Sequence, residues 1–324
     1  MRRAVPLSFT RRTQRGAALL LAMLIVTLVA TLAAGMVWQQ WRAIEVESAE
    51  RTRNQASWLL AGALDWARII LREDNKTVDA LTEPWATGLA DIRLSTFLAA
   101  DKDNNSSADP GIDAFLSGTI TDAQSRYNLH NLIEDDEETA TLELQNLQRL
   151  CEVLGLPAET ATRIAAGMRG AEAAEADLDE DATPAAGAPL PPQRPSQLTW
   201  LGLDAETVRR LSPFVVMLPD VAKVNINTAP PEVLMAVLPG LDRASAERLV
   251  QARQRTAFDT LDKAQALLPE SIKLKDSKYL QLNTTYFEIT GQLRYENLTL
   301  RELSLVRRNG TDVTVLRRER LPHE

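Results

Sequence analysis

The chain has 324 residues, of which 45% are hydrophobic and 25% charged, so it can bury a sizeable core and form more than one domain. The formal net charge is -8, and five arginines (+5) precede Gly16, which leaves -13 for the rest of the chain. Such an acidic body repels nucleic-acid phosphates. The single cysteine, Cys151, excludes an internal disulfide framework and is expected to be a buried core thiol. Two histidines without a cysteine pair argue against a zinc site.

Residues 17–41 carry no charge, and their apolar part through Val37 is about the ~20 residues that a helix needs to span a bilayer. The arginines before this segment predict a cytoplasmic amino terminus, which places everything after Trp41 on the far side of the membrane. A secretory signal peptide cleaved near Ala33 to Gly35 and an uncleaved signal anchor are the alternatives.

The amino-terminal order is a basic leader (1–16), then Gly16, then an apolar run that begins at once with Ala17. This order resembles the type IV prepilin class, which implies cleavage by a prepilin peptidase between Gly16 and Ala17 and methylation of the new terminus. Pilins usually carry a glutamate at the fifth mature position, where this chain has Leu21. An unpaired carboxylate is costly in an apolar bundle, so its absence suits a subunit with no neighbour ahead of it.

Residues 42–72 continue the helix, because apolar residues such as Leu60, Leu64 and Leu71 recur at helical spacing among charged ones. Residues 73–133 are predicted to form the first part of a pilin-type α/β domain. Two short strands are expected on either side of a turn that contains Asp122, Gln124 and Ser125. The nearby Asn128 and Asn131 are expected to satisfy backbone groups at a domain junction.

Residues 134–282 contain a diffuse repeat with copies that begin at Leu150, Leu198 and Leu234. Each copy has an apolar helix end, a glycine-containing turn and an acid-rich start to a second helix, which predicts helical hairpins. The third copy resembles the helix-hairpin-helix module of DNA receptors. Its turn, however, reads Gly240-Leu241-Asp242, where a carboxylate would repel a phosphate, so a structural use is favoured over nucleic-acid binding.

From residue 283 to 324 the pattern changes to period two, and Asn309-Gly310 is a strong hairpin signal, so three antiparallel strands are expected. The predicted fold is therefore α+β: an amino-terminal pilin helix and an antiparallel pilin-type sheet, interrupted by a large all-α insertion with units like the sterile-alpha-motif or helix-hairpin-helix type.

Together, the leader junction, Leu21, the segment VNINTAPPEVL from residue 224 and the order of domains resemble the K-type minor pseudopilins of type II secretion. The resemblance implies a non-enzymatic subunit of the pseudopilus tip, anchored by one helix in the inner membrane with its carboxy-terminal domain in the periplasm. It also implies partners: minor pseudopilins of the I, J and H types, the prepilin peptidase and the inner-membrane assembly platform. A membrane-anchored DNA receptor or a minor pilin of a type IV pilus is the alternative.

Relatives in this family bind calcium through acidic loops, and a loop with several acids follows the first repeat here. The resemblance therefore makes calcium a possible ligand, with a merely solvated loop as the alternative. The candidate residues are Glu172, Glu175, Asp177, Asp179 and Asp181. A second acidic segment, 101–113, lacks the ligand alternation of an EF-hand and is expected to be a solvated turn.

Overall fold

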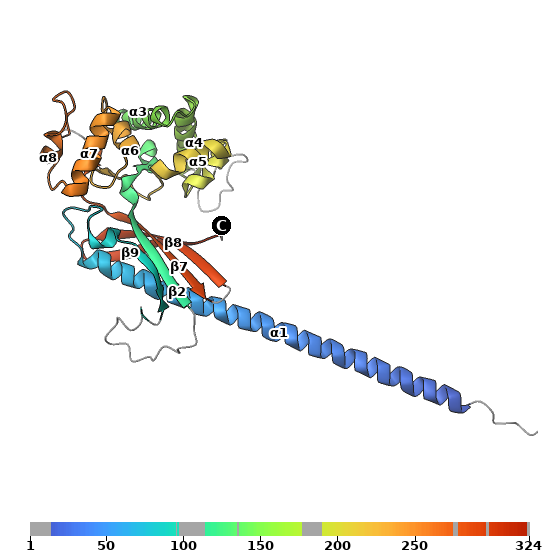
Figure 1. The fold of residues 1–324 in the computed structure, drawn as a ribbon. Coiled ribbons are helices and arrows are strands. Elements are labelled where there is room, and N and C mark those ends of the chain that lie inside the picture. The colour runs from blue at the N-terminus through green and yellow to red at the C-terminus, as the bar shows by residue number, and fades with distance from the viewer. Residues whose placement is uncertain are drawn as a thin grey trace, which may run out of the picture. The chain divides into compact units, whose positions relative to one another are not determined.

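The computed structural model describes residues 14–94, 96, 114–134, 136–176, 190–274, 278–295 and 298–322. The chain divides into two compact units, Met1–Trp58 and Leu59–Glu324. One helix, α1 (Gln14–Glu73), runs through both (Figure 1).

Among the described residues, the first unit is the part of α1 up to Trp58, which includes its apolar segment. Its most apolar stretch has a mean hydropathy of 2.6, and none of that stretch is buried by the rest of the protein. The hydroxyls of Thr27 and Thr31 donate to the carbonyls of Leu24 and Leu28, each at 2.9 Å, so the helix satisfies its own polar atoms, as a lipid environment requires. In the described part of the chain, α1 is the helix long and apolar enough to cross a membrane.

The second unit is built on a five-stranded sheet with the order β1-β2-β7-β8-β9, in which every neighbouring pair is antiparallel. Its strands are β1 (Leu89–Arg93), β2 (Ala114–Asp122), β7 (Tyr286–Tyr295), β8 (Leu298–Asn309) and β9 (Asp312–Leu321). The tight turn after β8 uses Gly310 at φ 60°, a conformation that glycine adopts without strain. The three expected carboxy-terminal strands and the α+β class are confirmed.

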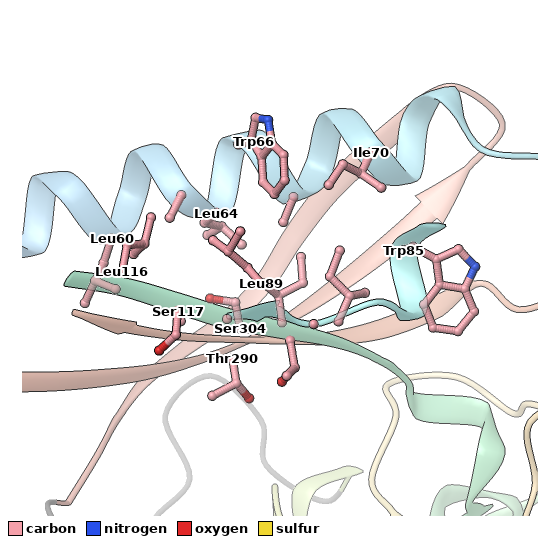
Figure 2. A pocket seen from close by; sticks show the side chains of 18 of the residues that line it. Leu60, Leu64, Trp66, Ile70, Trp85, Leu89, Leu116, Ser117, Thr290 and Ser304 are labelled. Carbon is pink, nitrogen blue, oxygen red and sulfur yellow. The ribbon is translucent and has the colours of Figure 1, made fainter. Parts of the chain in front are cut away.

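The carboxy-terminal part of α1 covers one face of this sheet (Figure 2). The ring of Trp85 meets that of Phe287 edge to face, with centroids 5.2 Å apart, an arrangement that aromatic pairs favour. Arg68 Nε also donates to the carbonyl of Val313 at 2.8 Å. The core between helix and sheet consists of Leu64, Ala67, Leu71, Trp85, Phe287, Ile289, Val306 and Val313.

The two predicted strands on either side of the turn at residues 122–125 are present as β2 and a short strand β3 (Tyr127–Asn128), but they do not pair with each other. Asp122 Oδ1 accepts from the Gln124 amide at 2.7 Å and thereby caps the short 3-10 helix η2 (Ala123–Ser125), which turns the chain out of the sheet. The following strand β3 therefore pairs in parallel with β4 (Val215–Val216). A second parallel pair joins β5 (Val224–Asn225) to β6 (Leu280–Gln281).

The helical region lies between β2 and β7 in sequence and gathers beyond one end of the sheet (Figure 1). Its α-helices are α3 (Glu137–Val153), α4 (Glu159–Ala176), α5 (Ala205–Leu211), α6 (Pro231–Val237), α7 (Arg243–Arg255) and α8 (Leu261–Gln265). The described residues also form the short 3-10 helices η1 (Pro84–Ala86), η3 (Leu129–Ile133), η4 (Pro195–Leu201) and η5 (Ser212–Phe214).

The three predicted hairpins are present, and their glycines have the expected left-handed backbone. Gly155, Gly202 and Gly240 have φ of 60°, 80° and 82°. In the second and third hairpins an aspartate follows two residues later and caps the next helix: Asp204 Oδ1 accepts from the Thr207 amide and Asp242 Oδ1 from the Ser245 amide. In the second hairpin the first arm is the 3-10 helix η4 rather than an α-helix.

One apolar core unites the helical region. Fully buried leucines and isoleucines from successive helices meet there, and Cys151 lies among them with 2% of its surface exposed, which confirms the expected buried thiol. Burial raises the pKa of the Cys151 thiol to about 11. The thiol is therefore both inaccessible and protonated at neutral pH.

We expect Cys151 to resist a maleimide or disulfide reagent at about pH 8 in the native protein and to react fully in denaturant, because only the exposed thiolate is nucleophilic. Labelling followed by mass spectrometry measures this. A Cys151→Ala/Ser196→Cys variant, with its thiol at an exposed position, is the control that must react in the native state. Rapid native labelling of Cys151 would contradict the packing described.

Candidate functional site

The residues expected at the processing junction lie at the start of α1. Gly16 is helical, and Ala17 and Leu21 are exposed on the same helix. Leu21 keeps 61% of its surface exposed, so this end of the helix presents apolar side chains to its surroundings. Cleavage between Gly16 and Ala17 stays a prediction.

The best-defined polar site is the junction at which the helical region leaves and rejoins the sheet. Asp122, the last residue of β2, is 2% exposed, and its carboxylate accepts hydrogen bonds from several separate segments. Besides the Gln124 amide, the donors are the hydroxyls of Thr228 and Thr284, each at 2.6 Å, and Asn225 Nδ2 at 2.9 Å. One carboxylate thus joins β2 to the segment after β5 and to the segment before β7. Burial raises its pKa, although each of these bonds opposes that rise.

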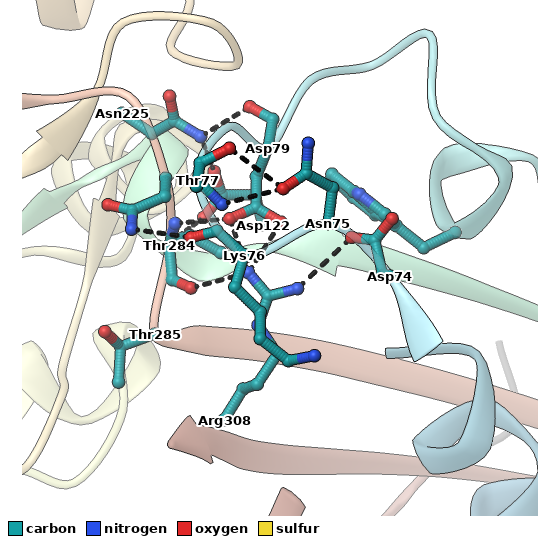
Figure 3. Close-up of polar contacts among 12 residues, drawn as sticks. Asp74, Asn75, Lys76, Thr77, Asp79, Asp122, Asn225, Thr284, Thr285 and Arg308 are labelled. Carbon is teal, nitrogen blue, oxygen red and sulfur yellow. Dashed lines mark hydrogen bonds and ion pairs between the residues drawn. The ribbon is translucent and has the colours of Figure 1, made fainter. Parts of the chain in front are cut away.

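A second buried carboxylate, Asp79, lies beside it (Figure 3). Asp79 is wholly buried and pairs with Arg308 of β8, whose Nη2 lies 2.7 Å from Oδ1. The Thr284 amide donates to Asp79 Oδ2 at 2.7 Å. The Arg308 guanidinium also contacts Asp74 at 3.2 Å and stacks on the Phe287 ring, 4.8 Å from its centroid. The pair therefore ties the chain after α1 to the end of β8.

The asparagines singled out in the sequence act as backbone partners, as expected. Asn128 Oδ1 accepts from the Leu218 amide at 3.0 Å, and its Nδ2 donates to the Asp220 carbonyl at 2.9 Å. Asn131 pairs in the same two-way manner with the amide and carbonyl of Ala222. Each side-chain amide thus accepts from one main-chain N–H and donates to one main-chain carbonyl, as the peptide group of a neighbouring strand would.

Asn227, in the VNINT segment, makes the same kind of two-way pair with the amide and carbonyl of Phe258, at 2.8 and 2.9 Å. Glu143 of α3 completes the polar layer, accepting from Tyr127 and Asn146 at 2.9 Å each. Burial raises the pKa of this glutamate. The layer therefore links α3 and the segment after α7 to the strands at the base of the helical region.

An apolar groove of about 420 Å³ lies between α1 and the sheet (Figure 2). Gly118 and Gly291 oppose each other across β2 and β7 on its floor, and a Cβ on Gly291 would come within 3.2 Å of Leu60. The groove is lined mainly by Leu60, Leu64, Ile70, Trp85, Leu116 and Ile289, and it also includes Glu302, which pairs with Arg318. Such a lining can hold apolar groups and offers no constellation for catalysis.

The calcium candidates are only partly placed. Glu172 is exposed on α4 and Glu175 belongs to the same helix, whereas Asp177, Asp179 and Asp181 lie outside the described residues, as does segment 101–113. Calcium binding stays a prediction.

Among the described residues, the carboxylates of Asp74, Asp79 and Glu83 lie within 4.8 Å of one another and could share a cation. Arg308 already supplies a positive charge there, so we assign no metal to them.

The helix-hairpin-helix turn does not favour a phosphate. Asp242 occupies the amino-terminal end of α7 and holds the Ser245 amide at 2.7 Å. This bond lowers the pKa of Asp242, which is therefore ionised at neutral pH. A negative charge stands where a DNA-binding hairpin would present amide groups to the backbone.

Two parts of the sequence match models of one protein family. Residues 125–220 and 224–283 each match a family described as "Type II secretion system (T2SS), protein K". The chain is 27% identical to type II secretion system protein K of Pectobacterium carotovorum subsp. carotovorum, over 95% of this chain and 97% of that protein. It is 28% identical to the Pseudomonas aeruginosa protein K, over 87% and 85%, and 29% identical to that of Klebsiella pneumoniae, over 94% and 96%.

A solved structure shares the fold. The match is a chain of the crystal structure of the GspK-GspI-GspJ complex from the enterotoxigenic Escherichia coli type 2 secretion system. The TM-score is 0.59 at 20% identity, and the match covers 85% of this chain and 99% of that one.

Replacing Asp122 by alanine should lower the free energy of unfolding by about 3 kcal/mol, because four donors would lose their buried acceptor. Urea denaturation of the full chain in detergent, followed by tryptophan fluorescence, measures the loss. Asp65→Ala, which removes an exposed ion pair with Arg68 on α1, is the matched control and should change stability much less. Equal losses in the two variants would contradict the role given to Asp122.

Proposed function

Because the chain belongs to the family of protein K of the type II secretion system, and is thus a minor pseudopilin, we propose that it caps the tip of the periplasmic pseudopilus. The observation that carries this proposal is the combination of Leu21 with a large helical insertion in the sheet. A subunit that has no neighbour ahead of it needs no carboxylate at the fifth mature position. A bulky insertion also hinders stacking beneath identical copies.

The proposed anchoring follows from the first unit. Residues 17–37 lie in the bilayer before assembly, with the arginine-rich leader in the cytoplasm and the second unit in the periplasm. The prepilin peptidase removes the leader after Gly16, and methylation of the Ala17 amine follows. The processed helix is then free to leave the inner membrane.

The proposed partners are minor pseudopilins of the I and J types, with an H-type subunit below them and the inner-membrane platform at the base. The support is the crystal structure of the GspK-GspI-GspJ complex described above. The fully exposed apolar part of α1 is the surface that such a bundle of helices would cover.

Members of the family are structural components of the secretion apparatus. We propose that this chain likewise acts by assembling with other subunits and has no catalytic activity. In the described residues, the most strongly buried carboxylates, Asp79, Asp122 and Glu143, bond to groups that hold the fold together. Binding of DNA, the alternative function, is disfavoured by Asp242.

Gly16→Val should leave the leader attached when the chain is expressed with its prepilin peptidase, because the branched side chain cannot enter a site shaped for glycine. Intact mass spectrometry reads the product. Gly35→Val, at the position where a signal peptidase would need a small residue, is the control and should be processed as in the wild type. Peptidase-independent cleavage, or loss of cleavage in the Gly35 variant instead, would contradict the assignment.

The tagged full chain should co-purify in detergent with co-expressed I- and J-type pseudopilins in a complex that contains one copy of each. Light scattering coupled to gel filtration gives the stoichiometry. Repeated copies of this chain in one complex would contradict a tip position. A salt-sensitive gel shift with duplex DNA would instead favour the DNA-receptor alternative.

A further inference from the structure

The buried junction holds more carboxylates than cations in contact with them. Arg308 contacts Asp79 and Asp74. Asp122 is held by the uncharged donors described above. Glu83 likewise accepts from uncharged groups, the Ala80 amide at 2.7 Å and the Trp85 indole at 2.9 Å.

The other charged groups that face the cluster do not balance it. Arg253 of α7 acts on Asp122 only at longer range, and its own Nη1 donates to the Ile226 carbonyl. Lys76 donates its ammonium to the Arg72 carbonyl at the end of α1. The groups that reach the cluster from the segments around β5 and before β7 are Asn225, Thr228 and Thr284, all uncharged.

The two most buried carboxylates are coupled through shared donors. Thr284 donates its amide to Asp79 and its hydroxyl to Asp122. Asn225 Nδ2 donates both to the Asp79 carbonyl and to the Asp122 carboxylate, each at 2.9 Å. Thr284 and Asn225 belong to the chain segments that attach the helical region to the sheet. Repulsion between the carboxylates of Asp79 and Asp122 is therefore transmitted to the segments that attach the helical region to the sheet.

We propose that this cluster is a proton-sensitive clamp: in a mildly acidic medium it takes up a proton at the Asp79–Asp122 pair, and the helical region is then held to the sheet more firmly than at neutral pH. A proton on Asp79 Oδ1 relieves part of the excess of buried negative charge and leaves the acceptors of the attachment in place, because the Thr284 amide bonds to Asp79 Oδ2 and the side chains of Thr284 and Asn225 bond to Asp122. Arg308 gives up its contact with Oδ1 and keeps its contact with Oδ2. Thr284 and Asn225 keep their partners, while the repulsion between the two carboxylates disappears.

The pKa shifts of the carboxylates in the cluster have the direction that the proton-sensitive clamp requires. Burial outweighs the Arg308 pair and raises the pKa of Asp79 from 3.8 to about 6, and burial also raises the pKa values of Asp122 and Glu83. A carboxylate with a raised pKa binds more protons in the folded than in the unfolded state, so its contribution to stability grows as pH falls. For Asp79 the contribution is complete below 3.8 and is lost as pH rises through about 6.

Other carboxylates of the protein change its stability in a different pH range. The helix-capping Asp136, Asp204 and Asp242 have lowered pKa values, because each accepts from amide or hydroxyl groups at a helix start. Their contribution is lost only when the pH falls below the usual range of an aspartate. The clamp can therefore be separated from ordinary acid denaturation.

The test compares thermal unfolding of the full chain in detergent at about pH 5 and about pH 7.5, where linkage predicts that the wild type unfolds several degrees higher at the acidic pH. Asp79→Asn and Asp122→Asn imitate the protonated acid and should each flatten this dependence. Asp65→Asn, at an exposed position on α1, is the matched control and should keep the wild-type dependence. Wild type and both junction variants with parallel pH profiles would overturn the proposal.

Hydrogen exchange of the wild type gives a second readout that needs no variant. After correction for the intrinsic pH dependence of exchange, the amides of the attachment segments, including Thr284, should be more protected at about pH 5 than at about pH 7.5. Protection that is equal or lower at acidic pH would overturn the clamp even if the variants did not fold. Neither readout depends on assembly with other pseudopilins.

Discussion

A carboxylate buried without a charged partner in contact must be satisfied by hydrogen bonds, and at Asp122 this requirement decides how the two parts of the second unit are joined. Its donors include Asn225 of β5, Thr228 after β5 and Thr284 before β7, so the carboxylate is satisfied only when these segments meet at the end of β2. The Asp79–Arg308 pair adds the chain after α1 to the same point. Sheet, helical region and the end of the pilin helix thus meet at one buried polar cluster.

Local patterns in the sequence predicted most of the elements. Helical spacing identified α1, period two identified β7 to β9, and Gly155, Gly202 and Gly240 identified the hairpin turns, because each of these signals lies within one stretch of chain. The asparagines were also interpreted correctly. The parallel pairs of β3 with β4 and β5 with β6 were not predicted, because two-residue strands carry no periodicity.

The junction itself was largely invisible to sequence reasoning. Asp79 and Arg308 lie 229 positions apart, so no local pattern in the sequence pairs them. One signal was available: Arg308 occupies the same face of β8 as the buried Val306, and a charge on an inward face needs a buried partner. The groove beside α1 could not be foreseen either, since it results from Gly118 and Gly291 meeting across two strands distant in sequence.

The helical region enters and leaves the sheet at directly paired residues, Asp122 of β2 and Phe287 of β7. In topological terms, β2 and β7 form an ordinary hairpin whose loop happens to be a domain. The entropy of closing a loop grows only with the logarithm of its length, so the pairing of these two strands depends only weakly on how long the loop is. The insertion can therefore change in length during evolution while the pilin framework keeps its register, as long as Asn225 and Thr228 keep their bonds to Asp122.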